Sequence, residues 1–243
     1  MNKNILVTGA SNGLGLTITA TLLKNNYTIY AISRTKSSAL IELENKYKNK
    51  LVLYSFDLIK NNSIQTELFG DGLIGYKVPL HGFVNNAAIA YDDIVTNLNI
   101  NKLDEMYKIN VYAPLIITKY VIRNMLFNKI KGSIVHLSSI SAHTGYKGLS
   151  MYASTKGALE AFSKNTSREW GTLDIRSNTV VAGFMETGMS GQLTNEQKNR
   201  IYKRTSLKGA TDKISVAETI SFLLSNKSNS ITGQDIYVDA GTI

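Results

Sequence analysis

The sequence contains no cysteine in its 243 residues. This absence excludes a disulfide framework, an iron–sulfur cluster, a zinc site built on thiolates and a cysteine nucleophile. Proline is nearly absent as well. Only Pro79 and Pro114 occur, so no proline-rich linker divides the chain.

Long hydrophobic runs are also missing. The longest candidate, residues 111–122, is interrupted by Pro114 and Lys119 and is shorter than the roughly 18 residues of a membrane span. Near the start, Ile5–Val7 are the only firmly apolar residues before the polar Thr8, whereas a secretory signal needs about 7–15. We therefore expect a soluble, cytoplasmic protein with no membrane partner.

Charged residues are sparse but unbalanced. They make up 19% of the chain against 43% hydrophobic residues, a composition that favours a folded core over disorder. Lys and Arg exceed Asp and Glu by 27 to 18, which gives a net charge of +9. The cations are scattered, with no dense stripe or interleaved aromatics, so we expect attraction of small anionic ligands and no nucleic-acid partner.

Short apolar runs alternate with longer amphipathic segments along the chain. The short runs are rich in Val, Ile and Leu, as buried parallel strands are, and the longer segments are typical of helices. This alternation predicts an α/β fold: a Rossmann-type, doubly wound, seven-stranded parallel sheet with helices on both faces. The expected strands are Ile5–Val7, Thr28–Ser33, Leu51–Phe56, Gly82–Val84, Ser133–Ser138, Ile175–Val181 and Ile236–Val238, and the expected helices are Leu14–Lys24, Ala39–Lys48, Ser63–Phe69, Leu103–Phe127, Met151–Trp170 and Val216–Leu224.

The alternation continues without a linker, so residues 1–243 are predicted to form a single catalytic domain. One polar segment, at about 186–208, interrupts it and contains Gly188 and Gly191. We expect this segment to be an insertion above the sheet that serves as a lid.

The first expected strand leads into a glycine-rich turn, Thr8–Gly15, that opens a helix. Glycines permit a tight turn and a close backbone approach to a pyrophosphate, and the helix N-terminus directs free N–H groups at the phosphates. The Gly-x3-Gly-x-Gly spacing is not followed by Gly-Lys-Ser/Thr, which excludes a nucleotide triphosphatase loop. The sequence therefore predicts a nucleotide site at Gly9, Ser11, Asn12, Gly13, Leu14 and Gly15.

The second expected strand ends at Ser33, which is followed by Arg34 and Lys36, with no acidic residue from position 33 to 40. An acid here would hold the ribose 2′-hydroxyl of NAD, whereas arginine forms charge-assisted hydrogen bonds with the 2′-phosphate of NADP. We therefore predict NADP(H) as the cofactor, with Ser33 and Arg34 in its site.

A tyrosine and a lysine, Tyr152 and Lys156, stand four residues apart on an expected helix and so share one face. A nearby ammonium favours the phenolate and lowers the pKa of a tyrosine. Taken alone, a tyrosine and a lysine at this spacing usually lie on an exposed helix face and have no catalytic function. Ser139 and Asn86, however, follow neighbouring strands, and ligands bind at the carboxyl ends of strands in open α/β sheets.

These motifs together resemble the short-chain dehydrogenase/reductase family, in its short single-domain branch. The resemblance covers nearly the whole chain. It rests on Thr-Gly-x3-Gly-x-Gly at Thr8–Gly15, Asp57-Leu58, Asn85-Asn86-Ala87, Asn110 within Lys108-Ile109-Asn110-Val111, Ser139, and Tyr152-x3-Lys156.

The resemblance implies a role for each matching residue. Tyr152 would be the general acid–base, Lys156 would lower its pKa and hold the nicotinamide ribose, Ser139 would bond the substrate oxygen, and Asn110 would position a water in the proton relay. Further cofactor contacts are implied at Asp57, Leu58, Asn86, Ala87, Gly183 and Thr187. No metal is implied, and His81, His136 and His143 lack ligand spacing, so packing or solvent roles are expected for them.

Within the family, the segments 183–187 and 233–241 are similar to 3-oxoacyl-(acyl-carrier-protein) reductases of fatty acid biosynthesis. This resemblance implies NADPH-dependent reduction of a 3-oxoacyl thioester linked to acyl-carrier protein or CoA. Ala182 departs from the usual proline, and Ala240 precedes the second glycine of the usual C-terminal pair. Ile130 and Leu173 stand where carrier-protein reductases tend to have docking arginines, with Lys129 and Lys131 beside the first.

Two other functions stay open at this point. One is an NADP(H)-dependent enzyme for another small alcohol or ketone, such as a sugar derivative, since one fold supports many substrates. The other is a non-catalytic NADP-binding protein. The resemblance also implies a homodimer or homotetramer formed through the long helices expected at 103–127 and 151–170.

Overall fold

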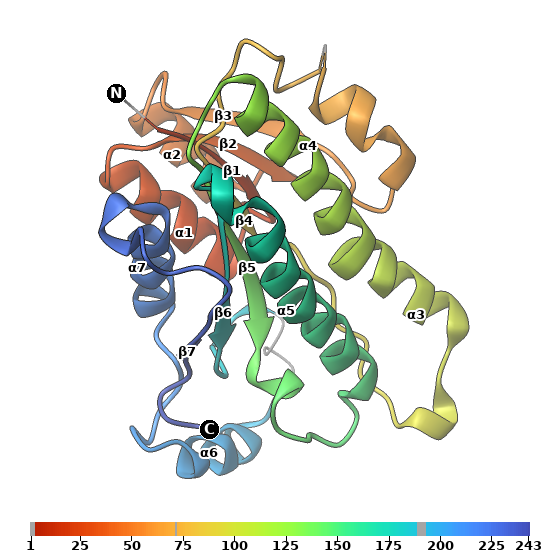
Figure 1. Ribbon diagram of the computed structural model, residues 1–243. Coiled ribbons are helices and arrows are strands. Elements are labelled where there is room, and N and C mark those ends of the chain that lie inside the picture. Colours follow the sequence, from red (N-terminus) through yellow and green to blue (C-terminus); the bar gives the residue numbers. More distant parts are fainter. Residues whose placement is uncertain (1–2, 71, 189–192) are drawn as a thin grey trace.

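Seven parallel strands form the centre of the computed structural model, which describes residues 3–70, 72–188 and 193–243 (Figure 1). Their order is β3-β2-β1-β4-β5-β6-β7, so the direction of winding reverses between β1 and β4. The predicted seven-stranded, doubly wound sheet is confirmed. The strands are β1 Asn4–Thr8, β2 Thr28–Ser33, β3 Leu51–Ser55, β4 Gly82–Asn85, β5 Ser133–Ser139, β6 Arg176–Ala182 and β7 Asp235–Val238.

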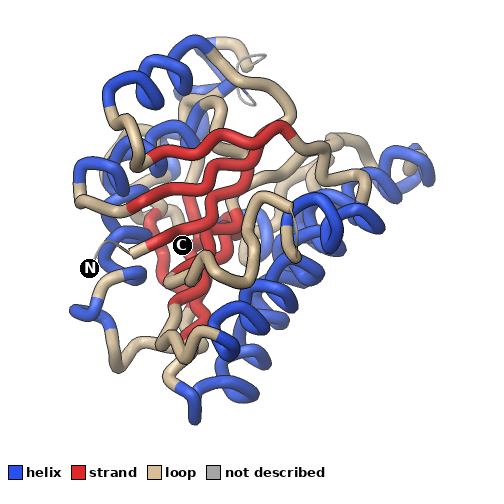
Figure 2. Tube along the Cα trace, turned by 90° about the horizontal axis from the view of Figure 1, so that it is seen from above, coloured by secondary structure: helices blue, strands red, loops and turns tan. Residues whose placement is uncertain are grey.

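Helices cover both faces of this sheet, as the view from above shows (Figure 2). On one face α1 and α7 pack together, and on the other lie α4 and α5 (Figure 1). None of the described helices is long and apolar enough to cross a membrane. The α-helices are α1 Gly13–Lys24, α2 Ser38–Lys46, α3 Ile100–Tyr107, α4 Ala113–Phe127, α5 Ser150–Trp170, α6 Asn195–Arg204 and α7 Lys213–Leu224.

The strands are apolar on both sides because each side faces a helix layer. Val7 and Val135 belong to the buried cluster beneath α1 and α7. Leu6 and Phe83 belong to a second cluster with α4. Successive side chains point to opposite faces, so neighbouring residues of one strand supply both cores.

The helix expected at 103–127 is confirmed as a helical stretch that runs without a break from Ile100 to Phe127, with one wide turn inside it. Between α3 and α4 the chain makes a wide turn with i→i+5 hydrogen bonds, at Lys108–Tyr112. Pro114 in the first turn of α4 has no N–H to donate to the carbonyl of Asn110, four residues earlier, so the regular pattern fails there. Asn110 is a buried residue of this wide turn.

The helix expected at 63–69 is confirmed over Ile64–Leu68, where it is a π-helix and not an α-helix. The segment forms a short 3₁₀ turn at Asn61–Ser63 and one wide turn at Ile64–Leu68. It ends at Gly70, whose φ of +68° is left-handed. The described residues between there and β4, 72–81, form no helix.

Helix boundaries elsewhere differ by a few residues for a visible reason. Helix α7 begins at Lys213, before its apolar periodicity, because the Asp212 carboxylate accepts hydrogen bonds from the N–H groups of Ile214 and Ser215. All seven strands end at the same edge of the sheet, and the predicted polar residues follow these ends.

Candidate active site

A cleft of about 650 Å³ lies at the carboxyl edge of the sheet, a volume in the range of small-molecule sites. It follows the ends of β1 to β6 and reaches the beginning of α5. Of the predicted cofactor residues, all but Gly183 line it: Gly9, Ser11, Asn12, Gly13, Leu14, Gly15, Ser33, Arg34, Asp57, Leu58, Asn86, Ala87, Tyr152, Lys156 and Thr187.

The glycine-rich turn is packed too closely for side chains. A Cβ on Gly15 would lie 2.0 Å from the carbonyl oxygen of Gly9, so the first turn of α1 rests directly on β1. The Asn86 amide fixes this arrangement by donating to the carbonyl oxygens of Thr8 and Gly9, at 3.2 and 3.0 Å. At Gly13, a Cβ would instead face Thr187 across the cleft at 3.7 Å.

The N-terminus of α1 opens into this cleft. Its cap residue, Asn12, makes no side-chain hydrogen bond to the first turn, and no acidic residue occupies that turn. The free N–H groups and the positive end of the helix dipole therefore favour an anion, and a phosphate is the anion that this geometry commonly binds.

The far end of the cleft is basic. Arg34 directly follows β2 and is exposed, and among the described residues no carboxylate pairs with its guanidinium. The hydroxyl of Ser37 donates to the carbonyl of Ser11, which joins the loop after β2 to the glycine-rich turn. A dinucleotide with a phosphorylated ribose fits the cleft, because the phosphate-binding turn and a cation lie along one wall.

Tyr152 and Lys156 lie on the first turns of α5 at the other end of the cleft. The Lys156 ammonium is buried, at 3% exposure. It donates to the carbonyl oxygen of Leu137 at 2.8 Å and lies 5.6 Å from the centre of the Tyr152 ring.

The ionisation of this pair differs from the expected lowering of the tyrosine pKa. Burial raises the pKa of Tyr152 to about 12, the negative charge of Asp92 adds to the increase, and a hydrogen bond to Ser139 opposes it. Burial lowers the pKa of Lys156 to about 8, against the opposing charge of Glu160. Desolvation thus outweighs the lysine charge in the free protein, and Tyr152 is a protonated donor at neutral pH.

Ser139 ends β5 beside Tyr152, although it does not line the cleft. Its hydroxyl oxygen accepts a hydrogen bond from the Ser141 N–H at 3.2 Å, which starts the short turn Ile140–Ala142. The structure therefore brings Ser139, Tyr152 and Lys156 together at one end of the cleft.

Asn110 is buried next to this group, at 1% exposure. Its side-chain oxygen accepts from the Ile89 N–H at 2.9 Å, and its nitrogen donates to the Ile89 carbonyl at 2.8 Å and to the Thr155 hydroxyl at 3.1 Å. These contacts tie the loop after β4 to α5. Pro114 has no N–H to donate to the main-chain carbonyl of Asn110, and a role of Asn110 in holding a water stays a prediction.

Gly183 is the predicted cofactor residue that does not line the cleft. A Cβ there would lie 2.3 Å from the Thr211 hydroxyl and 2.6 Å from the Asp239 Cα, so this glycine allows the C-terminal segment to pack on the end of β6.

Several apolar residues that line the cleft were not predicted, because in the sequence they look like ordinary core residues. They are Ile32, Phe56, Ile89, Ile109, Leu137 and Met185.

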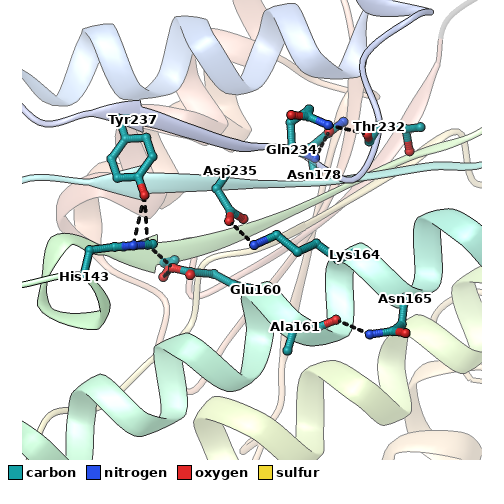
Figure 3. A network of polar contacts seen from close by, with 11 residues as sticks. His143, Glu160, Ala161, Lys164, Asn165, Asn178, Thr232, Gln234, Asp235 and Tyr237 are labelled. Carbon is teal, nitrogen blue, oxygen red and sulfur yellow. Dashed lines mark hydrogen bonds and ion pairs between the residues drawn. The ribbon is translucent and has the colours of Figure 1, made fainter. Parts of the chain in front are cut away.

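The histidines stand outside the cleft lining. His136 is fully buried in β5, and burial lowers its pKa to about 3. His81 accepts from the Asn4 N–H at 3.1 Å. His143 lies near Glu160 and Tyr237, so its expected packing role agrees with its contacts (Figure 3).

The expected lid segment includes helix α6. Residues 189–192, with Gly191, lie outside the described residues. Helix α6 is anchored at its C-terminal end, where the Tyr202 hydroxyl donates to Glu186 at 2.6 Å and Ser206 bonds the Gly241 carbonyl at 2.9 Å. Movement of this segment as a lid stays a prediction.

Comparison with known proteins agrees with this geometry. The family model described as "Enoyl-(Acyl carrier protein) reductase" matches residues 9–242. The chain is 31% identical to the 3-oxoacyl-[acyl-carrier-protein] reductase FabG of Staphylococcus epidermidis over 248 residues, covering 99% of both chains. It is 29% identical to an L-xylulose reductase of Caenorhabditis elegans over 244 residues, covering 99% of this chain and 95% of the relative.

A solved structure of ElxO with NADP bound matches with a TM-score of 0.88 and 26% identity, covering 100% of this chain and 99% of that one. Relatives with different named substrates thus match at similar identity, and all match nearly end to end. The chain belongs to the short-chain dehydrogenase/reductase family and is an NAD(P)-dependent oxidoreductase.

Proposed function

We propose that this protein is an NADPH-dependent reductase that converts the 3-oxo group of an acyl thioester to a hydroxyl group. The observation that carries the proposal is the single cleft that joins an anion-binding helix end and the Arg34 cation to Tyr152 and Lys156. FabG enzymes among the relatives support the thioester, and the NADP in ElxO supports the phosphorylated cofactor.

Different residues along the cleft would hold different parts of the cofactor. The first turn of α1, with Gly9, Gly13 and Gly15, would hold the pyrophosphate, and Arg34 would hold the 2′-phosphate. Ser11, Asn12, Leu14 and Ser33 would line the same wall, with Asp57 and Leu58 at the adenine and Asn86, Ala87 and Thr187 toward the nicotinamide. When bound, NADPH supplies the hydride for the carbonyl carbon.

The chain itself supplies the proton and the orientation. The Tyr152 hydroxyl would donate its proton to the carbonyl oxygen as that oxygen gains negative charge, and a pKa of about 12 keeps the proton on Tyr152 until then. The Ser139 hydroxyl would donate a hydrogen bond to the same oxygen. Lys156 would orient the ribose hydroxyls, and the carbonyl of Asn110 would hold the water that returns a proton.

The surface near Leu173 bears on how the thioester arrives. Ile130 packs against the buried cluster, and Leu173 is 52% exposed. Lys131 forms an ion pair with Asp174 at 2.7 Å, so this lysine is already paired. With neutral residues at both positions, we expect CoA-linked and carrier-linked 3-oxoacyl groups to be reduced at comparable rates.

A substrate panel tests the proposal. Purified protein is mixed with NADPH or NADH and acetoacetyl-CoA, acetoacetyl-acyl-carrier-protein, L-xylulose or a simple ketone, and absorbance at the reduced nicotinamide band is followed. We expect turnover of both thioesters with NADPH preferred. Turnover of the sugar alone would refute reduction of a thioester. It would favour the second candidate function, reduction of a sugar derivative, which the L-xylulose reductase relative supports.

A further inference from the structure

A buried carboxylate lies one helical turn beyond the lysine of the cleft. Glu160 follows Lys156 by four residues on α5, so the two side chains share a face. Glu160 is 6% exposed and Lys156 is 3% exposed. Opposite charges that are withdrawn from water interact more strongly at a given separation than exposed charges do.

Two groups from other elements contact the Glu160 carboxylate, and a third group contacts one of these two. The Ser138 hydroxyl, at the end of β5, donates to Oε1. The His143 Nε2 lies 3.0 Å from the same oxygen, and the Tyr237 hydroxyl of β7 lies 3.0 Å from the His143 Nδ1 (Figure 3). A carboxylate only accepts, so Nε2 carries a proton and donates to Oε1.

These contacts bracket Ser139. Ser138 precedes it directly, and His143 follows the short turn Ile140–Ala142 that Ser139 begins. The carboxylate on α5 therefore holds the chain on both sides of the serine that faces Tyr152.

We propose that Glu160 is a positioning residue of the active site: its carboxylate is the counter-charge that keeps buried Lys156 protonated, and it fixes the strand end that carries Ser139. The inference rests on the proposed function for its kinetic readout.

The other charged groups around this carboxylate are few. On α5, Lys164 pairs instead with Asp235 of β7 (Figure 3). On β5, His136 stays neutral because burial lowers its pKa to about 3. Lys156 is thus the cation whose protonation depends most directly on Glu160, and this agrees with the opposing effect of Glu160 on the lowered Lys156 pKa.

Variants at Glu160 separate charge from shape. Glu160→Gln keeps the size and one acceptor but removes the charge, whereas Glu160→Asp keeps the charge and loses reach toward Ser138 and His143. We expect Glu160→Gln to move the alkaline midpoint of NADPH binding and of kcat/KM to lower pH by about one unit. We expect Glu160→Asp to leave the midpoint in place and reduce kcat.

Three further variants keep the test decisive if Glu160→Gln does not fold. His143 is partly exposed, and His143→Lys would place an ammonium against the carboxylate and neutralise it, so the midpoint should fall as well. His143→Gln is its neutral match and should not move the midpoint. Lys164→Gln, one turn further along α5, is the control for loss of a charge on the same helix.

NADPH binding is measured by fluorescence of the bound nucleotide from pH 6 to 10, with NADH used if NADPH does not bind, and kcat/KM is measured over the same range. A lower midpoint in Glu160→Gln and His143→Lys, unchanged in the three other variants, supports the inference. An unchanged midpoint in a folded Glu160→Gln or His143→Lys variant overturns it. Absence of thioester turnover would refute the proposed substrate, and the binding profile would still decide the role of Glu160.

Discussion

Replacing Arg34 by alanine gives the sharpest test of cofactor choice. The guanidinium follows β2 directly, lines the cleft and is exposed. A hydrogen bond to a charged group contributes about 1.5–3 kcal/mol, and exposure to solvent favours the lower end. A loss of about 1.5 kcal/mol corresponds to roughly tenfold weaker binding of NADPH. NADH has no 2′-phosphate, so its affinity should stay the same.

The assay is a fluorescence titration of NADPH and NADH against wild type and Arg34→Ala. Lys24→Gln, which removes a cation at the opposite end of α1, is the matched control and should change neither affinity. Raising the salt concentration should narrow the wild-type preference for NADPH, since the site is exposed. An equal loss for both nucleotides, or no loss for NADPH, would refute the assignment of Arg34 to the 2′-phosphate.

Three further predictions concern stability, measured by urea unfolding. Gly15→Ala should destabilise the fold by several kcal/mol, because its Cβ would lie 2.0 Å from the Gly9 carbonyl, whereas Gly157→Ala, with nothing within 4 Å, should stabilise α5 by about 0.5–1 kcal/mol. Asn110→Ala should cost about 1–3 kcal/mol by leaving the Ile89 N–H and carbonyl unpaired, while exposed Asn165→Ala should cost almost nothing. His136, with its pKa lowered to about 3, stays neutral in the fold while the unfolded chain takes up a proton, so stability should fall by about 2 kcal/mol from pH 6.5 to 5, and His136→Phe should remove that loss.

Each of these three has a clear contrary outcome. Equal stabilities of Gly15→Ala and Gly157→Ala would mean that the turn can open without cost. An Asn110→Ala protein as stable as Asn165→Ala would remove the structural account of the Ile89 contacts. An identical acid dependence in wild type and His136→Phe would assign the loss to other groups.

Much of the fold was predictable because its signals are local. Short runs rich in Val and Ile between amphipathic segments identified every strand of the sheet. The glycine-rich turn was predictable for the same reason. At Gly9 and Gly15 the backbone packs directly against neighbouring backbone, which only a residue without a side chain allows. Pro114 was visible in the sequence, but whether a proline ends a helix, kinks it or opens a wide turn depends on what packs around it.

The rest of the site depends on contacts between distant segments. Gly183 belongs to a glycine-containing motif, but its close approach to Thr211 and Asp239 becomes visible only in the fold. The direction of the Tyr152 pKa depends on burial, which spacing alone does not give. Glu160 has no sequence signal, because an acid four residues after a lysine is typical of any solvated helix face.

The central claim is that Tyr152 is the proton donor for an NADPH-dependent reduction. Its most direct test is the rate of NADPH oxidation by Tyr152→Phe with acetoacetyl-CoA, alongside a fluorescence titration of NADPH. We predict that the variant binds NADPH as wild type does and loses activity by a factor of about 10²–10⁴. A Tyr152→Phe protein with bound NADPH and full activity would contradict the account.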